Sequence, residues 1–507
     1  MEANGSTTSD AQSDESDLLD TDSDITSSFV PSQQDRLSEL PNEILTKICD
    51  FISPAGNDSA SLARLGQTSK ELRAVVEPCL YRHIKSTYLP LWKTEWPHYL
   101  KPSRPGSLKV LMLLRTLAAK PHCKEHVRSI DLFRHEFWWI EADLFHPCDE
   151  CHREPFKDAD LMALGLMEGR FYNGYCEHRS YAEDDAALLL SVAPNVTEAK
   201  ISVTVTETSQ NLLARGIHPW NSSNSLKKLE LVFRTHCGHR PEETDLNDIA
   251  GLWIVTPNLE GLTISGCGMV KGGPNLSSLK SLILNDCWFT TDDISTVLAN
   301  LPELRHFKKF HSDACSWADE NADHIFEDSA QPSEVLACLL PLAARLKRVV
   351  ITHWHIWPAP DVSKLIWTFS QFPALKSLGI DIQALYRCPE FDFATLISGC
   401  PELKHLLILN ILRELPGLTN VRAIHVWKGL DRLGDAITPH NQFPALRKVQ
   451  LLHVKSRQAM FDYMEMREDF DDVFANDILR LKFERGGVEF TIGDQGSTKG
   501  PCTQLDE

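Results

Sequence analysis

Apolar and polar positions recur in one short pattern along most of this chain. The spacing apolar-x-x-apolar-x-apolar is found at Val127/Ile130/Leu132, Val196/Ala199/Ile201, Leu226/Leu229/Leu231, Leu259/Leu262/Ile264, Leu279/Leu282/Leu284, Leu346/Val349/Ile351, Leu375/Leu378/Ile380, Leu403/Leu406/Ile408, Val421/Ile424/Val426 and Leu446/Val449/Leu451. Alternation in such a short segment predicts a β-strand that sends its second and third apolar residues into a core. Helical stretches such as DDISTVLANLPEL lie between copies. Each repeat is therefore expected to form a helix, a turn and a strand.

The copies are spaced as a solenoid requires. From Leu226 onward most successive copies begin roughly 18 to 33 residues apart, and the wide gap from Leu279 to Leu346 leaves room for a decayed copy at Leu304/Phe307. Cys267 and Cys287 stand where leucine-rich repeats place Asn or Cys in a turn, so we expect structural thiols there. The expected fold is α/β, an irregular leucine-rich-repeat-like solenoid with parallel strands on one face and helices on the other.

A different period occupies the segment before these repeats. LSELPNEILTKICDFI places Leu40, Ile44 and Ile48 on one helical stripe, with Pro41 acceptable in a first turn. SLARLGQTSKELRAVVEPCLYRHI continues with apolar residues at helical spacing, interrupted near Gly66 and Pro78. Two or three short helices are therefore expected. So small a unit needs a partner or the rest of the chain for stability.

These helices carry a family resemblance. The order Leu40-Pro41, Glu43-Ile44-Leu45, Ile48, Leu62, Leu65, Thr68-Ser69-Lys70, Leu72-Arg73, Val76 and Leu80-Tyr81 resembles an F-box, although Leu72 replaces a frequent Trp and the spacer Ser53 to Ser61 is long. The resemblance covers about a tenth of the chain. It implies docking on a Skp-type adaptor within a cullin-based ubiquitin ligase. The adaptor-binding residues it implies are Leu40, Pro41, Ile44, Leu45, Ile48, Leu62, Leu65, Leu72, Leu80 and Tyr81.

The expected organisation has four parts. Residues 1–34 are rich in Ser and Asp and poor in apolar residues, which predicts a disordered acidic tail. Residues 35–85 form the helical module, and residues 86–480 form the solenoid with an insertion near 140–182. In residues 481–507, strand-like runs around Gly486-Gly487 predict a hairpin that caps the solenoid, followed by a frayed end.

Target binding is expected on the concave face of the sheet. The strand residues between the core positions would point there, and large apolar groups exposed on such a face usually mark a protein-binding surface. The predicted anchors and neighbours are Arg348, Trp354, Leu407, Leu409, Trp427 and Leu452. The alternative is that loops or the C-terminal segment cover this face.

The insertion contains the sharpest cluster of metal-binding residue types. Cys148 and Cys151 form a Cys-x-x-Cys pair, and Cys176 and His178 follow as Cys-x-His. Thiolates and imidazole suit tetrahedral zinc, and four protein ligands leave no open position for a catalytic water. A structural zinc is therefore one interpretation. Reduced, unliganded thiols are the other, and no further cofactor is expected.

Net charge and composition reduce the number of function classes that fit this sequence. The net charge of −19 opposes general binding to nucleic acid or an anionic membrane. The chain lacks a membrane-length apolar run or a secretory signal, so an intracellular protein of cytoplasm or nucleus is expected. No catalytic motif appears. The leading hypothesis is a non-enzymatic substrate receptor that binds adaptor, cullin and an unidentified target protein. The alternative is a scaffold that does not direct degradation.

Overall fold

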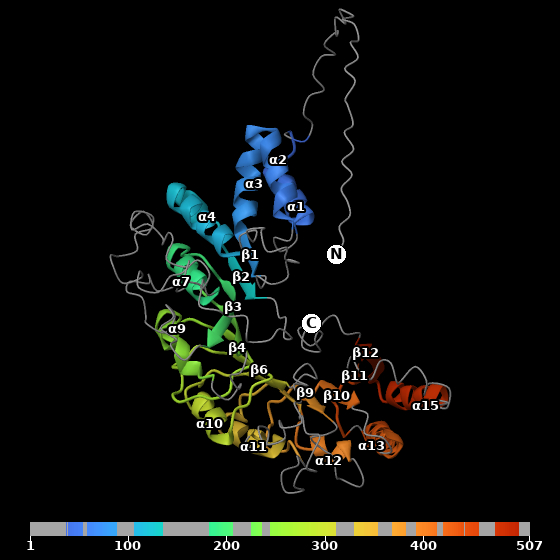
Figure 1. Ribbon diagram of the computed structural model, residues 1–507. Coiled ribbons are helices and arrows are strands. Elements are labelled where there is room, and N and C mark those ends of the chain that lie inside the picture. Colours follow the sequence, from blue (N-terminus) through green and yellow to red (C-terminus); the bar gives the residue numbers. More distant parts are fainter. Residues whose placement is uncertain are drawn as a thin grey trace, which may run out of the picture.

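The computed structural model describes residues 37, 39–53, 58–88, 106–134, 182–205, 225–235, 244–310, 329–352, 368–381, 392–412, 419–440, 442–455 and 472–495. Within these ranges the chain forms an N-terminal group of helices followed by a curved solenoid (Figure 1). Strands lie along the inner side of the curve and helices along its outer side.

The N-terminal helices are α1 (Asn42–Ile52), α2 (Ser59–Thr68) and α3 (Lys70–Arg82). Asp58 caps α2 by accepting from the Ser61 amide at 3.0 Å, and Ser69 caps α3 by accepting from the Leu72 amide at 3.1 Å. These bonds satisfy amides that a helix start leaves open. The three helices enclose a small core made of Cys49, Leu62, Val76 and Cys79.

The described strands form one parallel sheet in strict chain order. They are β1 (His83–Tyr88), β2 (Ser129–Arg134), β3 (Glu198–Val205), β4 (Lys228–Thr235), β5 (Gly261–Ser265), β6 (Ser281–Asn285), β7 (His306–Phe310), β8 (Arg348–Ile351), β9 (Ser377–Asp381), β10 (His405–Leu412), β11 (Lys448–Lys455) and β12 (Glu489–Gln495). Because each strand pairs with the next, equivalent residues stack in columns along the solenoid. This confirms the mixed α/β solenoid with parallel strands.

Helices connect the strands and cover the outer face of the sheet (Figure 1). They are α4 (Gly106–Ala119), α5 (Pro121–Lys124), α7 (Ala182–Val192), η6 (Leu246–Ile249), α9 (Ala250–Val255), α10 (Thr291–Ala299), α11 (Pro332–Leu339), η9 (Leu340–Leu342), α12 (Phe393–Ile397), α13 (Thr419–His440) and α15 (Asp472–Arg485). One continuous hydrophobic core lies between helices and sheet.

The register places the predicted apolar positions in columns. Leu229, Leu262 and Leu282 are aligned on β4, β5 and β6, and all three are buried. The decayed copy at Leu304/Phe307 is confirmed, because Phe307 aligns with Leu282 in strand β7. Nine of the ten predicted copies supply strands of this sheet.

The prediction of a strand at Val421/Ile424/Val426 is wrong, because these residues lie in α13. Val426, Leu430, Leu433 and Ile437 are buried at helical intervals. The short apolar spacing also fits a helix, and only the longer window distinguishes the two periods.

The predicted C-terminal hairpin is also wrong. The first run belongs to α15, and β12 after it pairs parallel to β11. Gly487 has a φ of +73°, which is the left-handed conformation that ends many helices. The Gly pair therefore ends a helix, and this segment is one more repeat. The sheet accordingly runs from His83 to Gln495 rather than from 86 to 480.

Cys267 and Cys287 occupy equivalent turns and are fully buried. The Cys267 thiol lies 3.6 Å from the Thr244 carbonyl, and the Cys287 thiol lies 3.4 Å from the Ile264 carbonyl. Burial raises the pKa of Cys287 to about 12, which keeps the thiol protonated. Both thiols are structural, as their place in the repeat predicted.

One core column contains a lysine. Lys309 aligns with Leu284 and Ile351, and its side chain is buried. Its ammonium donates to the Ala330 carbonyl at 2.9 Å. Burial lowers the pKa of Lys309 to about 8, with opposing contributions from Cys287 and Glu334. The charge therefore destabilises the folded chain at neutral pH.

We expect Lys309→Met to remove a pH dependence of stability. The unfolded ammonium keeps a pKa of about 10.4, so between about pH 8 and 10 the unfolded chain binds more protons and the contribution of Lys309 to the unfolding free energy rises, by up to about 3 kcal/mol. The stability difference, variant minus wild type, should fall by that order between about pH 7 and pH 11 in urea unfolding. A difference that does not change with pH would contradict a buried, shifted lysine.

Candidate functional site

Helix α1 carries apolar residues on two sides. Leu45 and Cys49 face inward and are 4% and 2% exposed. Leu40, Ile44 and Phe51 are 36%, 41% and 87% exposed. Ile44 and Phe51 are seven residues apart and lie on one face of α1, whereas Leu40 lies just before the helix. We call these three residues the outer apolar stripe. A stripe of large apolar side chains facing water indicates a protein-binding surface.

The residues predicted to bind an adaptor divide into exposed and structural groups. Leu40, Pro41 and Ile44 are exposed, and Ile48 and Leu65 are half-buried. The remaining residues pack inside the protein: Leu45, Leu62 and Leu72 are buried, Leu80 packs against the helical core, and Tyr81 packs against the solenoid core. Their side chains support the surface and do not form it.

Sequence reasoning missed Phe51. It lies seven residues after Ile44, so the heptad spacing was visible in the sequence. Its neighbours Asp50 and Ile52 belong to other faces of the helix: Asp50 pairs with Arg82 at 2.8 Å, and Ile52 packs inward. Phe51 is the most exposed large apolar side chain among the described residues.

The helical module is joined to the solenoid without a linker. Helix α3 ends at Arg82 and β1 begins at His83. Lys120, at the start of α5, pairs with Glu77 of α3 at 2.9 Å. Burial raises the pKa of Tyr81, whose ring packs against the solenoid core. The outer apolar stripe is therefore held at a fixed position at one end of the sheet.

Among the described residues one group has metal-ligand types in close proximity. Glu77, His122 and Cys123 place their ligand atoms within 4.8 Å of one another. The Lys120 ammonium already pairs with Glu77, and burial raises the pKa of Cys123, which disfavours the thiolate that a metal needs. This group fits a contact between α3 and α5. The predicted zinc ligands Cys148, Cys151, Cys176 and His178 lie outside the described residues.

The concave face begins with opposite charges in register. Lys85, Asp131, Lys200 and Glu230 are aligned on β1 to β4. Lys85 lies 3.8 Å from Asp131, and Lys200 lies 2.6 Å from Glu230. In the adjacent column Lys228 pairs with Glu198 at 2.9 Å. These pairs neutralise one another, so this part of the face has little local charge to offer a ligand.

Further along, the concave face becomes apolar but buried. Val350, Leu407, Leu409 and Leu452 are at most 3% exposed and form a cluster separate from the main core. Leu407, Leu409 and Leu452 do lie in the predicted strand positions, but the prediction that they are exposed anchors is wrong. The four side chains contact one another across neighbouring strands.

The other predicted target contacts are placed differently. Arg348 is half-buried at the start of β8. Trp427 lies in α13 and not in a strand, so it does not belong to the concave face of the sheet. Trp354 lies outside the described residues.

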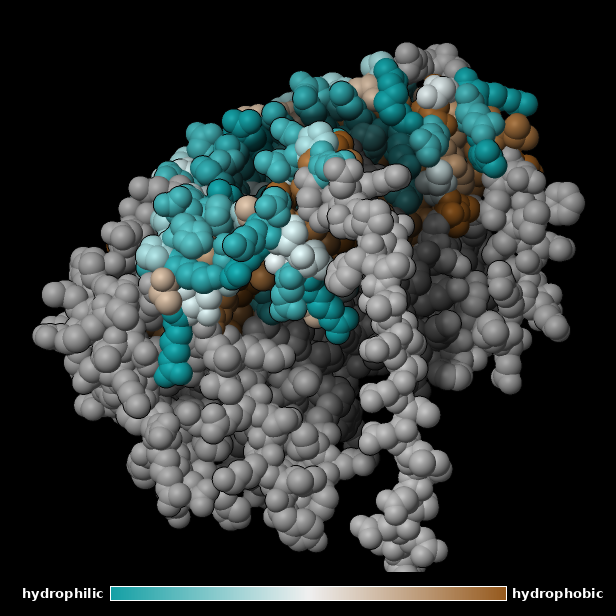
Figure 2. All heavy atoms as spheres, turned by 90° about the horizontal axis from the view of Figure 1, so that it is seen from above, coloured by the Kyte–Doolittle hydropathy of each residue, from teal (hydrophilic) through white to brown (hydrophobic). Residues whose placement is uncertain are grey.

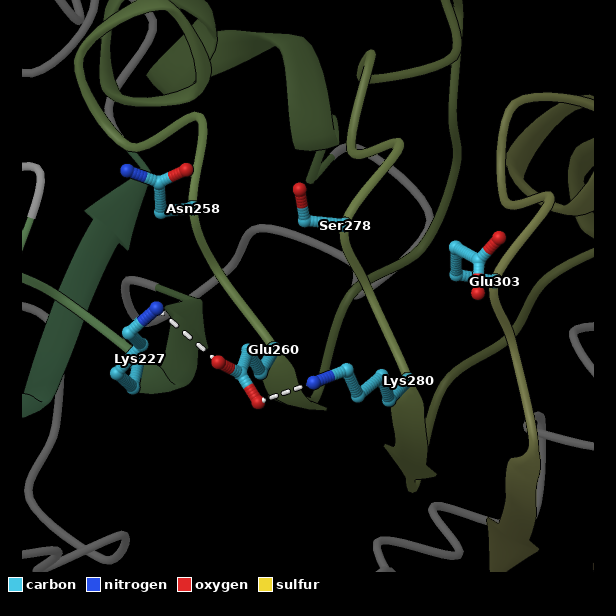
Figure 3. A pocket seen from close by; sticks show the side chains of 6 residues that line it. All are labelled: Lys227, Asn258, Glu260, Ser278, Lys280 and Glu303. Atoms are coloured by element: carbon cyan, nitrogen blue, oxygen red, sulfur yellow. Dashed lines mark hydrogen bonds and ion pairs between the residues drawn. The ribbon is translucent and has the colours of Figure 1, made fainter.

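A shallow polar hollow lies where β4 to β7 begin. Lys227, Asn258, Glu260, Ser278, Lys280 and Glu303 line it, and its volume is about 230 Å³. The Glu260 carboxylate bridges Lys227 at 3.0 Å and Lys280 at 2.7 Å (Figure 3). A small-molecule site usually has a largely apolar lining, which this hollow lacks. It marks a charged edge of the sheet.

Comparison with known proteins assigns the helical module. Residues 37–87 match the family model described as F-box-like. That range contains the outer apolar stripe, all three module helices and nearly all of β1. A comparison of the whole sequence with curated proteins finds no match. None of the helices in the described ranges has the length and apolar character to cross a membrane.

The two sides of α1 predict opposite mutational effects on stability. Leu45→Ala should lower the unfolding free energy of the module by about 2–5 kcal/mol, because it leaves a cavity. Ile44→Ala should change it by about 0.5 kcal/mol or less, since Ile44 is 41% exposed. Urea unfolding followed by circular dichroism measures the unfolding free energy of the two variants. Equal losses would mean that Ile44 also packs inside.

Proposed function

We propose that the chain is a substrate-recognition subunit of a cullin-based ubiquitin ligase. The observation that carries the proposal is the exposed stripe of Leu40, Ile44 and Phe51 within the segment that matches the F-box-like family. F-box segments generally bind Skp-type adaptors. The stripe supplies the apolar contact for such an adaptor, and the solenoid supplies a separate surface for a target protein.

The direct junction between the helical module and the solenoid supports this arrangement, because it fixes their relative position. Since α3 continues directly into β1, the adaptor and a target on the solenoid are held at a constant separation. The receptor needs no catalytic group, because its contribution is to hold the target near the transfer machinery. We propose a leucine-rich-repeat-like identity for the solenoid, on its helix-turn-strand units and its buried turn cysteines.

A non-degradative scaffold remains the second candidate. The residue columns of the sheet offer a repeat surface to a stable partner whether or not that partner is ubiquitinated. Target turnover separates the two functions. A bound partner whose lifetime is unchanged when the stripe is disrupted would favour the scaffold.

We expect Ile44→Ala/Phe51→Ala to lose adaptor binding while remaining folded. Each truncation removes an exposed apolar contact, and hot-spot residues of interfaces contribute about 2 kcal/mol or more, so the affinity should fall at least about tenfold. Titration of the purified full chain with a purified Skp-type adaptor measures this directly. Co-purification of the cullin from extract then tests the larger complex.

The matched control for this experiment is Ile254→Ala/Ile478→Ala. These two side chains are 79% and 56% exposed on α9 and α15, far along the chain from the module. The control should bind the adaptor as wild type does. Equal weakening by both double variants, or no adaptor binding by the wild-type chain, would remove the ubiquitin-ligase proposal.

A further inference from the structure

The start edge of the sheet carries a run of cations. The residue immediately before each of β7 to β11 is basic, and we call these five residues the basic row: Arg305, Lys347, Lys376, Lys404 and Arg447. Their backbones form an unbroken ladder, in which each amide donates to the carbonyl of the preceding member at 2.7–2.8 Å. The row is therefore a fixed consequence of the strand register.

Among the described residues, few carboxylates neutralise the row. Arg305 lies 3.8 Å from Glu303, and Lys376 lies 3.6 Å from Glu402, both at exposed positions where ion pairs are weak. Lys347, Lys404 and Arg447 form no ion pair with any described residue. The contrast with β4 to β6 is direct, because Glu260 there bridges two lysines (Figure 3).

Neighbouring side chains extend the positive field. Arg348 and Lys448 occupy the next column inward, where His306 is aligned with Arg348 and His405 with Lys448. Lys448 pairs with Glu489 at 3.2 Å, so Arg348 is the main addition to the positive field. Burial, and then the charges of Arg348, Lys308, Lys347 and Arg305, lower the pKa of His306. Burial, and then Arg348, Lys448 and Lys404, lower the pKa of His405. Burial is the larger cause of both shifts, the cations of this edge add to it, and Glu489 opposes the shift of His405.

The row is accessible. Lys404 and Arg447 are exposed, the side chains of Arg305 and Lys376 are 45% and 43% exposed, and Lys347 is half-buried. Figure 2 shows that hydrophilic side chains predominate over the described part of one face of the molecule, with hydrophobic ones among them. Five strands about 4.8 Å apart span about 19 Å, which an extended peptide covers with about six residues.

We propose that the basic row binds an extended, carboxylate-rich segment of a partner protein. The cations are spaced singly along the ladder, which matches charges distributed along a chain, whereas a phosphate site gathers several donors around one group. The net charge of −19 opposes a nucleic acid, whose long phosphate backbone would meet the acidic remainder of the protein. This inference rests on the proposed function, in which the segment belongs to the target.

The test uses the full chain and a fluorescein-labelled acidic peptide of about ten residues, in which Asp and Glu alternate with Gly and Ser. Lys347→Glu/Lys404→Glu should weaken binding by about tenfold or more, because two attractions become repulsions. Anisotropy titration measures the affinity. Binding by wild type should also weaken as salt rises from about 50 to about 300 mM.

The matched control is Lys70→Glu/Lys428→Glu, which changes the net charge equally at exposed lysines on α3 and α13. It should bind the acidic peptide as wild type does. Equal losses in the two double variants would overturn the proposal, as would the absence of binding by the wild type at low salt. A neutral Asn/Gln peptide that binds equally well would do the same.

Two further outcomes would reassign the row. Stronger binding of a single-stranded oligonucleotide than of the acidic peptide would favour nucleic acid and overturn the proposal. Peptide binding that appears only after removal of residues 1–34, which contain eight acidic and no basic residues, would assign the row to the chain's own tail. Adaptor binding is measured separately, so loss of either function leaves the other interpretable.

Discussion

The in-register pairing of parallel strands is the constraint on which the other features depend. Each strand accepts only one alignment, because a shift by one residue would turn every core side chain toward solvent. Once that alignment is fixed, the residues of each repeat position stand in a column about 4.8 Å apart. The core column, the charge-paired columns of β1 to β4 and the basic row all follow from it. A property of a single repeat thereby becomes a property of the whole face.

Much of this architecture was predictable from the sequence. Ten short apolar patterns predicted the strands, and nine of them are strands, because burial on one side of a sheet imposes a period of two. Strand β1 was missed because His83 directly follows a helix, with no turn residue to signal a change. The hairpin was misassigned because a Gly pair ends a helix as readily as it turns a strand. Local pattern alone does not distinguish these cases.

The candidate sites were less predictable than the fold. The family resemblance located the module, but it did not separate exposed Ile44 from buried Leu45, since both are apolar neighbours on one helix. Leu407 and Leu409 point to the predicted face, yet their burial depends on contacts between repeats far apart in sequence. The basic row was visible as the residue after the first apolar position of each repeat. Only its alignment in space makes it a surface.

The spacing of the basic row has a consequence for the stability of the chain when no ligand is bound to it. Like charges repeated at strand separation repel one another, and the backbone ladder prevents them from moving apart. Without a bound ligand, the folded chain is therefore destabilised by this repulsion, which dissolved ions screen. Added salt should make the free chain harder to unfold, and it should weaken the proposed binding of an acidic segment. The stability of the solenoid and its affinity for an acidic ligand should thus change in opposite directions as ionic strength rises.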